Sequence, residues 1–203
     1  MERLQQQIDF ILEIDKLKKV IRQNYLADGS RKESDTDHSW HLAIMCFLLA
    51  EYANNDIDVL KTMKMVLIHD IVEIDAGDTY AYDKNASDSD KTERELLAAE
   101  RIFNILPEDQ AKEIRALWDE FEEGNTMEAR FANALDKIQP ALLNDASGGK
   151  SWIEHGVEYS QVLKRNERTS EGSKELWAYI KEIIDKNVVS GKIINKWWVK
   201  SIN

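Results

Sequence analysis

Apolar residues recur at intervals of three and four along almost the whole chain, and this spacing is the strongest constraint on its fold. It matches the period of an α-helix that buries one face. Only two prolines and eight glycines interrupt it in 203 residues, and no strand pattern competes with it. The sequence therefore predicts an all-α protein, with helices over 4–25, 37–54, 57–75, 89–105, 108–123, 126–146, 151–167 and 171–189.

The length fits one domain with a core that needs no disulfides. We expect a single helical bundle over residues 1–190 and a C-terminal tail over 191–203 that carries Trp197 and Trp198. The polar and aromatic stretch 76–90 is the one long loop predicted. Loops of that length in compact domains are often functional.

Charge and cysteine content limit the compartment and the partners. The single cysteine, Cys46, excludes a disulfide scaffold and favours a reducing compartment. The chain starts without a basic, apolar leader, and no apolar run approaches the ~18 residues that span a bilayer, so we expect a cytoplasmic protein without a membrane partner. A net charge of −11 disfavours a nucleic acid polymer as partner. A small phosphate ester stays possible, because a metal ion and one or two arginines set the local potential.

The segment from His69 to Glu73 predicts a metal site. His69 and the adjacent Asp70 offer a nitrogen and an oxygen ligand to a divalent cation. On a helix their side chains lie ~100° apart, which is close enough to reach one ion. Glu73 stands one turn further along the same edge, where it is placed for proton transfer.

Two other segments are candidates for the remaining ligands. His38 and His41 share a helix face, and we prefer His38 because it lies near the helix start, where the side chain can project into a cleft. Asp136 occupies an otherwise apolar face, which is costly for a carboxylate unless it is paired or bound to metal. Taken one at a time, these histidines fit a buried core and Asp136 fits an ion pair with a neighbouring Arg or Lys, such as Arg130. Their combination favours the metal site.

The order His38, His69-Asp70, Asp136 resembles the ligand signature of the HD phosphohydrolase superfamily. Three segments, 16–22, 31–39 and 69–78, also resemble the bacterial 5′-deoxynucleotidases in order and spacing, and the resemblance covers most of residues 10–165. It implies an HD-type bundle.

Carried over residue by residue, the resemblance implies specific roles. Glu73 would transfer protons, Asp78 would lie near the attacking water, and Arg22 would contact phosphate. The implied metal ligands are His38, His69, Asp70 and Asp136. Arg31 is a further candidate phosphate contact because its planar donors suit phosphate oxygens, although an ion pair or a solvated surface would explain it equally well.

Two positions separate the chain from neighbouring families. Gln23 stands where the deoxynucleotidases have a tryptophan near the sugar, so the resemblance does not extend to a preference for deoxyribose over ribose. Ile74 follows Glu73, whereas guanosine-tetraphosphate hydrolases have a Glu-Asp pair there, which disfavours that activity.

These residues together predict a metal-dependent phosphohydrolase acting on nucleoside 5′-monophosphates or a similar small monoester. One divalent transition metal, Mn, Co, Fe, Ni or Zn, suits the mixed ligands better than Mg. The alternatives are a non-catalytic HD module that binds a nucleotide or partner, and a nucleotide phosphodiesterase. The extent of apolar surface on the helix over 37–54 and the tryptophans Trp177, Trp197 and Trp198 predict a homodimer that uses the C-terminal region.

Overall fold

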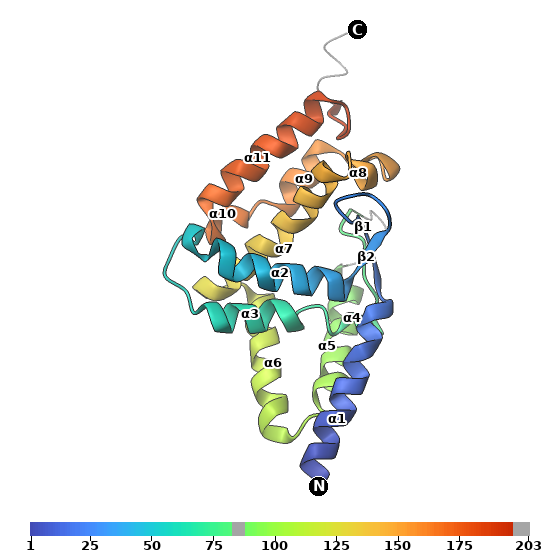
Figure 1. The fold of residues 1–203 in the computed structure, drawn as a ribbon, viewed down its shortest axis with the longest axis vertical. Helices are drawn as coiled ribbons and strands as arrows, with labels where there is room; N and C mark the ends of the chain where they lie inside the picture. Colours follow the sequence, from blue (N-terminus) through green and yellow to red (C-terminus); the bar gives the residue numbers. More distant parts are fainter. Residues whose placement is uncertain (83–87, 197–203) are drawn as a thin grey trace.

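The computed structural model describes residues 1–82 and 88–196, and helices form nearly all of their regular structure (Figure 1). This confirms the all-α prediction. The α-helices are α1 (Glu2–Ile14), α2 (Asp35–Leu49), α3 (Val59–Ile68), α4 (Glu73–Ala76), α5 (Asp88–Phe103), α6 (Glu108–Glu123), α7 (Met127–Ala146), α8 (Lys150–Glu154), α9 (Tyr159–Arg165), α10 (Thr169–Gly172) and α11 (Lys174–Val189). Two 3-10 helices, η1 (Asp15–Lys19) and η2 (Ala50–Tyr52), and two strands, β1 (Ile21–Tyr25) and β2 (Lys32–Ser34), complete them.

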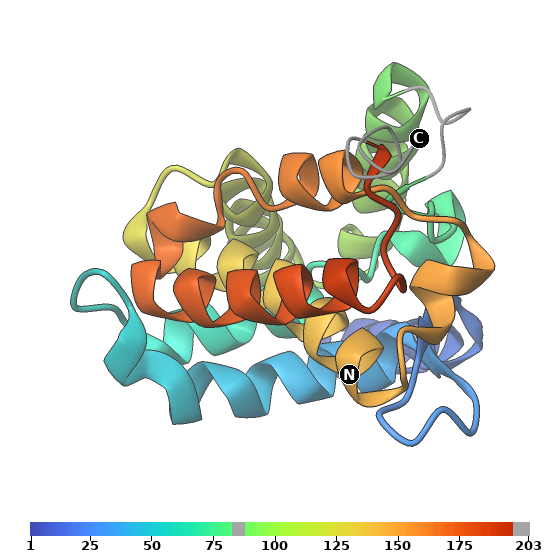
Figure 2. The ribbon, with the colours of Figure 1, turned by 90° about the horizontal axis from the view of Figure 1, so that it is seen from above.

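Helix α7 lies at the centre of the bundle. It contacts α2, α3, α6, α10 and α11, and α2 and α11 flank it when the molecule is seen from above (Figure 2). Phe131, Leu135 and Ile138 on α7 are buried among apolar neighbours. Because the helix is covered on most sides, its polar residues Asp136 and Gln139 are buried with them. The central helix therefore delivers a carboxylate and an amide to the interior.

A reciprocal cap fixes the start of α2. The Ser34 hydroxyl accepts a hydrogen bond from the Asp37 N–H at 3.2 Å, and the Asp37 carboxylate accepts one from the Ser34 N–H at 2.8 Å. This arrangement satisfies two amide donors that the first turn leaves without partners. It starts the helix at Asp35, two residues before the predicted start, and both Asp35 and His38 face the interior.

The prediction of one helix over 4–25 is wrong in its second half. Helix α1 ends at Ile14, and residues 21–25 form β1, which pairs antiparallel with β2 in the register Ile21 to Ser34. The turn between the strands holds Asp28-Gly29, and Gly29 has a φ of +68°, which glycine adopts without strain. The Asp-Gly pair was the sequence signal for this hairpin. Its consequence is that Arg22 points inward from a strand.

Three other predicted helices are interrupted. The segment 57–75 divides into α3 and α4, so His69 and Asp70 lie in the turn between them, and the indole N–H of Trp118 donates to the His69 carbonyl at 3.1 Å. The segments 151–167 and 171–189 each divide into two helices as well. Gly156, with a φ of +56°, separates α8 from α9, and the Ser173 hydroxyl caps a fresh start at α11.

The chain beyond α11 returns to the body of the protein. The Ile194 N–H donates to the Val157 carbonyl at 2.9 Å, the Tyr159 N–H donates to the Ile194 carbonyl at 2.8 Å, and Ile193 is buried. Trp197 and Trp198 lie outside the described residues, and the division into 1–190 and 191–203 stays a prediction. Within the described ranges, no helix combines the length and apolar character needed to cross a membrane.

Candidate metal centre

Side chains from three parts of the chain meet beside α7. His38 from α2, His69 from the turn after α3, and Asp136 from α7 each offer a donor atom within 4.8 Å of the other two. His38 Nε2 lies 3.0 Å from Asp136 Oδ1, and His69 Nε2 lies 3.7 Å from the same oxygen. Asp70 completes the group, with Oδ1 3.1 Å from His69 Nε2 and Oδ2 4.0 Å from His38 Nε2. The structure thus brings together all four predicted ligands.

Hydrogen bonds at the far side of each imidazole fix its orientation. His38 Nδ1 lies 3.0 Å from Gln139 Oε1, and His69 Nδ1 lies 3.0 Å from the Val66 carbonyl. Both partners are acceptors, so each Nδ1 donates to its partner, and in the neutral ring that binds metal each Nε2 presents a lone pair to the cluster. Gln139 is itself held by Glu33, whose Oε2 accepts from Gln139 Nε2 at 2.9 Å.

The donor set fits a bound cation. Ligand atoms about 2.1 Å from a common ion lie about 3 to 3.5 Å from one another, close to the separations found here. His69 Nε2 is buried and has no hydrogen-bond partner within the described part of the chain, although carboxylate oxygens surround it. A buried ligand atom that has no hydrogen-bond partner and faces carboxylate oxygens indicates a site for a metal ion. Burial, followed by the positive charge of Arg22, lowers the pKa of His38 to about 4, which keeps its ring in the neutral form that binds metal.

A second group of carboxylates adjoins the first. Asp35, Asp70 and Glu73 each place an oxygen within 4.8 Å of the other two, and one oxygen of Asp35 and one of Glu73 are buried with no partner that the described residues supply. Burial raises the pKa of Glu73 to about 11, and the negative charges of Asp70 and Asp35 add to this rise. Bound cations favour the ionised form of nearby carboxyl groups. Glu73 is therefore positioned beside the predicted metal without belonging to the His38, His69 and Asp136 group.

Arg22 ties the hairpin to this cluster. Its Nη1 lies 2.8 Å from Asp70 Oδ2 and 3.3 Å from Asp35 Oδ1, and the side chain is buried. The guanidinium thereby orients Asp70 and offsets part of the negative charge. It also lines the two pockets that meet beside the cluster, as the predicted phosphate contact requires.

The first of these pockets opens over the candidate metal ligands. Its empty space, open solvent included, is about 630 Å³, and it is lined by His69, Asp70 and Asp136. Glu73 and Asp78 face the same space, and burial raises the pKa of Asp78. The predicted catalytic acids thus lie beside the predicted ligands.

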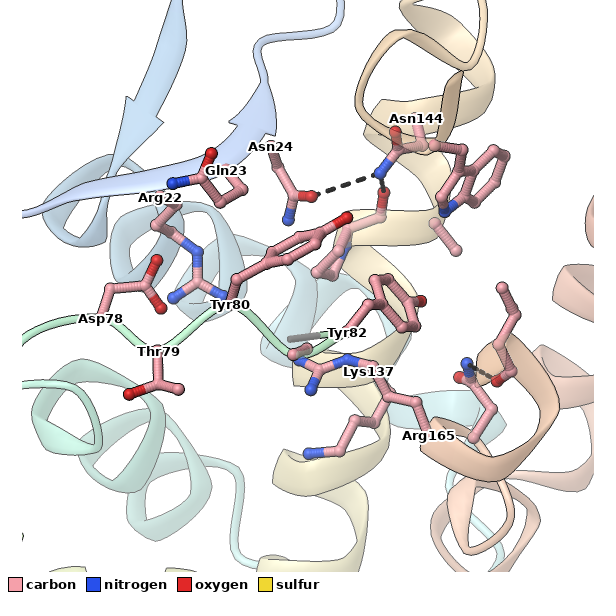
Figure 3. A pocket seen from close by; sticks show the side chains of 16 residues that line it. Arg22, Gln23, Asn24, Asp78, Thr79, Tyr80, Tyr82, Lys137, Asn144 and Arg165 are labelled. Atoms are coloured by element: carbon pink, nitrogen blue, oxygen red, sulfur yellow. Dashed lines mark hydrogen bonds between the residues drawn. The ribbon is translucent and has the colours of Figure 1, made fainter. Parts of the chain in front are cut away.

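The second pocket, of about 530 Å³, continues from the first past Arg22 and Asp78 (Figure 3). Its walls include Tyr80, Tyr82 and Trp152. The Tyr80 ring packs against His155, with 4.3 Å between the ring centroids. Amide side chains line another part of this pocket, where Asn144 Nδ2 donates to Asn24 Oδ1 at 3.3 Å.

Sequence reasoning and structure differ most over the cationic residues. Arg31 is exposed, lies 2.7 Å from Asp37, and is not among the residues that line the two pockets, so its contact with phosphate stays a prediction without geometric support. Lys137 and Arg165 do line both pockets and extend into the same space in Figure 3. Lys137 pairs with Asp136 at 2.8 Å, which is the pairing with a neighbouring Arg or Lys that the sequence left open. Adjacency to Asp136 was a signal for Lys137, whereas no motif marked Arg165.

A family model described as HD domain matches residues 14–177, which is most of the chain. The chain belongs to the HD domain family. The predicted HD-type bundle is thereby confirmed, and His38, His69, Asp70 and Asp136 are the histidine and aspartate residues that meet in its centre.

Curated relatives carry a more specific name. The 5′-deoxynucleotidase HDDC2 of Bos taurus is 31% identical over 137 residues, which cover 66% of this chain and 64% of that protein. The Dictyostelium discoideum protein of the same name is 33% identical over 141 residues, with 66% of this chain and 74% of that protein covered. The match thus spans less than two thirds of the bovine relative.

Solved structures resemble the chain over nearly its full length. A protein from Magnetospirillum magnetotacticum MS-1, described as a predicted metal-dependent phosphohydrolase, has a TM-score of 0.90 and 49% identity, and the match covers 95% of this chain and 96% of that one. A conserved hypothetical protein from Pyrococcus furiosus has a TM-score of 0.60 and 27% identity, with 88% and 97% covered.

Proposed function

We propose that this protein is a metal-dependent phosphohydrolase that releases phosphate from nucleoside 5′-monophosphates or a similar small monoester. The observation that carries the proposal is the continuity of the two pockets. One holds the candidate metal ligands with Glu73, and the other offers aromatic and amide side chains that suit a nucleoside. The names of the related proteins support the same chemistry.

The ligands His38, His69, Asp70 and Asp136 suit one divalent transition metal, Mn, Co, Fe, Ni or Zn, better than Mg. When bound, such an ion polarises a phosphoryl oxygen and makes water more acidic.

The remaining side chains position phosphate and move protons. Arg22, Lys137 and Arg165 provide donors around the space next to the metal ligands, where they bind the phosphate oxygens. Glu73 accepts a proton from the attacking water while the oxygen of that water bonds to phosphorus. The bond from phosphorus to the ester oxygen breaks, and the departing alkoxide takes up the proton that Glu73 accepted and leaves as the alcohol. Asp78, two residues beyond the end of α4, lines the same space and holds the water in line.

The aromatic pocket binds the leaving nucleoside. Tyr80, Tyr82 and Trp152 offer ring surface for a base, and Gln23 and Asn24 offer hydrogen bonds to its sugar or its edge. Lys32 Nζ donates to Gln23 Oε1 at 2.6 Å, so the carbonyl end of this side chain is engaged. A polar residue at position 23 gives no reason for a strong preference for deoxyribose.

A substrate panel tests the proposal. We expect Mn²⁺ or Co²⁺ to support release of inorganic phosphate from ribo- and deoxyribonucleoside 5′-monophosphates, with kcat/KM at least ~10-fold above that of p-nitrophenyl phosphate, which leaves most of the nucleoside pocket empty. Binding of metal and nucleotide with no release of phosphate would instead identify a non-catalytic HD module. Cleavage of dinucleotides without cleavage of monoesters would identify a phosphodiesterase.

We also propose a cytoplasmic homodimer. Support comes from the outer face of α2, where Trp40, Phe47 and Leu48 are 64%, 48% and 59% exposed. Apolar patches of this kind on soluble proteins usually mark interfaces. In light scattering, we expect the intact protein and a chain truncated after Gly191 to have twice the chain mass, as dimers do. We expect Phe47→Glu to have the mass of a single chain. A monomeric intact chain contradicts the dimer, and a truncated monomer places the interface on the tail instead.

A further inference from the structure

A third pocket lies on the surface between α7 and the segment α9 to α10. Its empty space, open solvent included, is about 620 Å³. We call it the basic pocket because Arg130, Lys164 and Arg168 line it together with Lys137 and Arg165. Two carboxylates, Glu167 and Glu171, face the same space. The surplus of positive charge contrasts with the net charge of −11 for the whole chain.

Only part of this positive charge is neutralised. Arg168 lies 3.0 Å from Glu171, and Arg130 lies 3.8 Å from the same carboxylate. Lys164 and Arg165 form no ion pair with any described residue. A concave surface with unpaired cations attracts anions more strongly than isolated surface lysines do.

The shape of the basic pocket is fixed by close packing beneath it. A Cβ at Gly172 would lie 2.2 Å from the Arg130 carbonyl oxygen, so α10 and α7 touch backbone to backbone at this point. Arg168 donates to the Gly124 carbonyl at 3.3 Å, and Asn133 donates to the Phe121 carbonyl at 2.7 Å. The cations are therefore presented by a rigid frame.

The basic pocket is continuous with the pocket over the metal ligands. Asn133, Lys137 and Arg165 line both. An anion beside Asp136 can therefore pass to the surface without leaving the reach of a cation. The aromatic pocket shares Lys137 and Arg165 with the basic pocket and has otherwise different lining residues, so the two products have different pockets through which to leave.

We propose that the basic pocket is a second oxyanion site, which inorganic phosphate occupies as it leaves the metal centre. The identification of phosphate as the product rests on the proposed function, whereas the existence of the site does not. Phosphate carries one to two negative charges near neutral pH and accepts hydrogen bonds on every oxygen, which matches the fork of Arg130 and the ammonium of Lys164.

Equilibrium dialysis with radiolabelled inorganic phosphate tests the site on the metal-loaded protein. We expect two phosphates per chain, and the double variant Arg130→Gln with Lys164→Gln is expected to bind the second at least ~10-fold more weakly while it keeps its metal. Both residues are exposed, so the fold should tolerate the change. The control, Arg115→Gln with Lys181→Gln, removes the same charge from α6 and α11 and is expected to bind two phosphates.

The Asp70→Ala variant separates the two sites. We expect it to lose the phosphate at the metal centre and to keep the one in the basic pocket, whether or not the protein hydrolyses nucleotides. A single phosphate per chain in the metal-loaded protein, or two unweakened phosphates in the Arg130 and Lys164 double variant, overturns the proposal. If circular dichroism shows that the double variant is unfolded, Lys164→Gln alone must weaken the second site severalfold, and unchanged binding overturns it.

Discussion

Asp70→Ala is expected to bind a divalent metal ion at least ~100-fold more weakly than the unchanged protein and to release phosphate only at background rates. Asp70 Oδ1 lies 3.1 Å from His69 Nε2, and Asp70 Oδ2 lies 2.8 Å from Arg22, so the substitution removes one ligand and frees the guanidinium that orients it. His38, His69 and Asp136 remain as ligands in the variant. The positive charge of Arg22 beside them has then lost its closest partner. Elemental analysis after dialysis against metal-free buffer measures the bound metal.

Asp56→Ala is the matched control, because Asp56 is exposed and lies outside the cluster. Its metal content and phosphate release should equal those of the unchanged protein. Circular dichroism of Asp70→Ala checks that the variant is still folded. Arg22 keeps Asp35 as a partner at 3.3 Å, so the hairpin should remain in place. A folded Asp70→Ala variant that retains a full equivalent of metal would remove Asp70 from the ligand set.

The candidate ligands could be picked out from the sequence because ionisable side chains are conspicuous in an apolar helix. Asp136 stands on an apolar face with Leu135 and Ile138, where a carboxylate needs a partner. His69 and Asp70 are likewise polar residues that directly follow the apolar helix α3. Such a conflict can be detected without any knowledge of the fold. Its resolution in space, with the donors within 4.8 Å, required the structure.

The local geometry around these ligands was less predictable. Apolar spacing made 57–75 look continuous, but the chain turns at His69, where Trp118 from a distant helix bonds to the carbonyl. A tertiary contact of this kind has no counterpart in the local sequence. The hairpin did have a signal, Asp28-Gly29, which helical spacing in residues 4–19 outweighed.

Residues that act through distant contacts were beyond sequence reasoning. Gln139 orients His38, and Arg165 reaches the pockets from α9, yet each is an ordinary polar residue in a helical pattern. Arg31 is the opposite case. Its planar donors suggested a phosphate contact, which stays a prediction, whereas in the structure Arg31 is exposed and paired with Asp37.

Glu73→Gln is expected to lower kcat for phosphate release by ~10²-fold or more while KM and metal content change little. Glu73 lies with Asp35 and Asp70, next to the metal ligands but outside the His38, His69 and Asp136 group, so its loss should spare the metal. Glutamine keeps the volume and one oxygen of the buried side chain and removes only its capacity to accept a proton from water. The loss should therefore appear in the chemical step.

Three measurements on Glu73→Gln distinguish proton transfer from a structural role: metal by elemental analysis, nucleotide affinity by calorimetry, and single-turnover release of phosphate. Glu182→Gln, which makes the same change at an exposed position of α11, is expected to match the unchanged protein in all three. Loss of metal together with activity would make Glu73 part of the ligand set. Unchanged single-turnover release would assign the proton transfer to another group. Asp78 lines the same pocket and would be the next residue to mutate. Only slow release with metal and affinity intact agrees with Glu73 as the base, because no structural role of this buried carboxylate would spare both kinds of binding while it slows the chemistry.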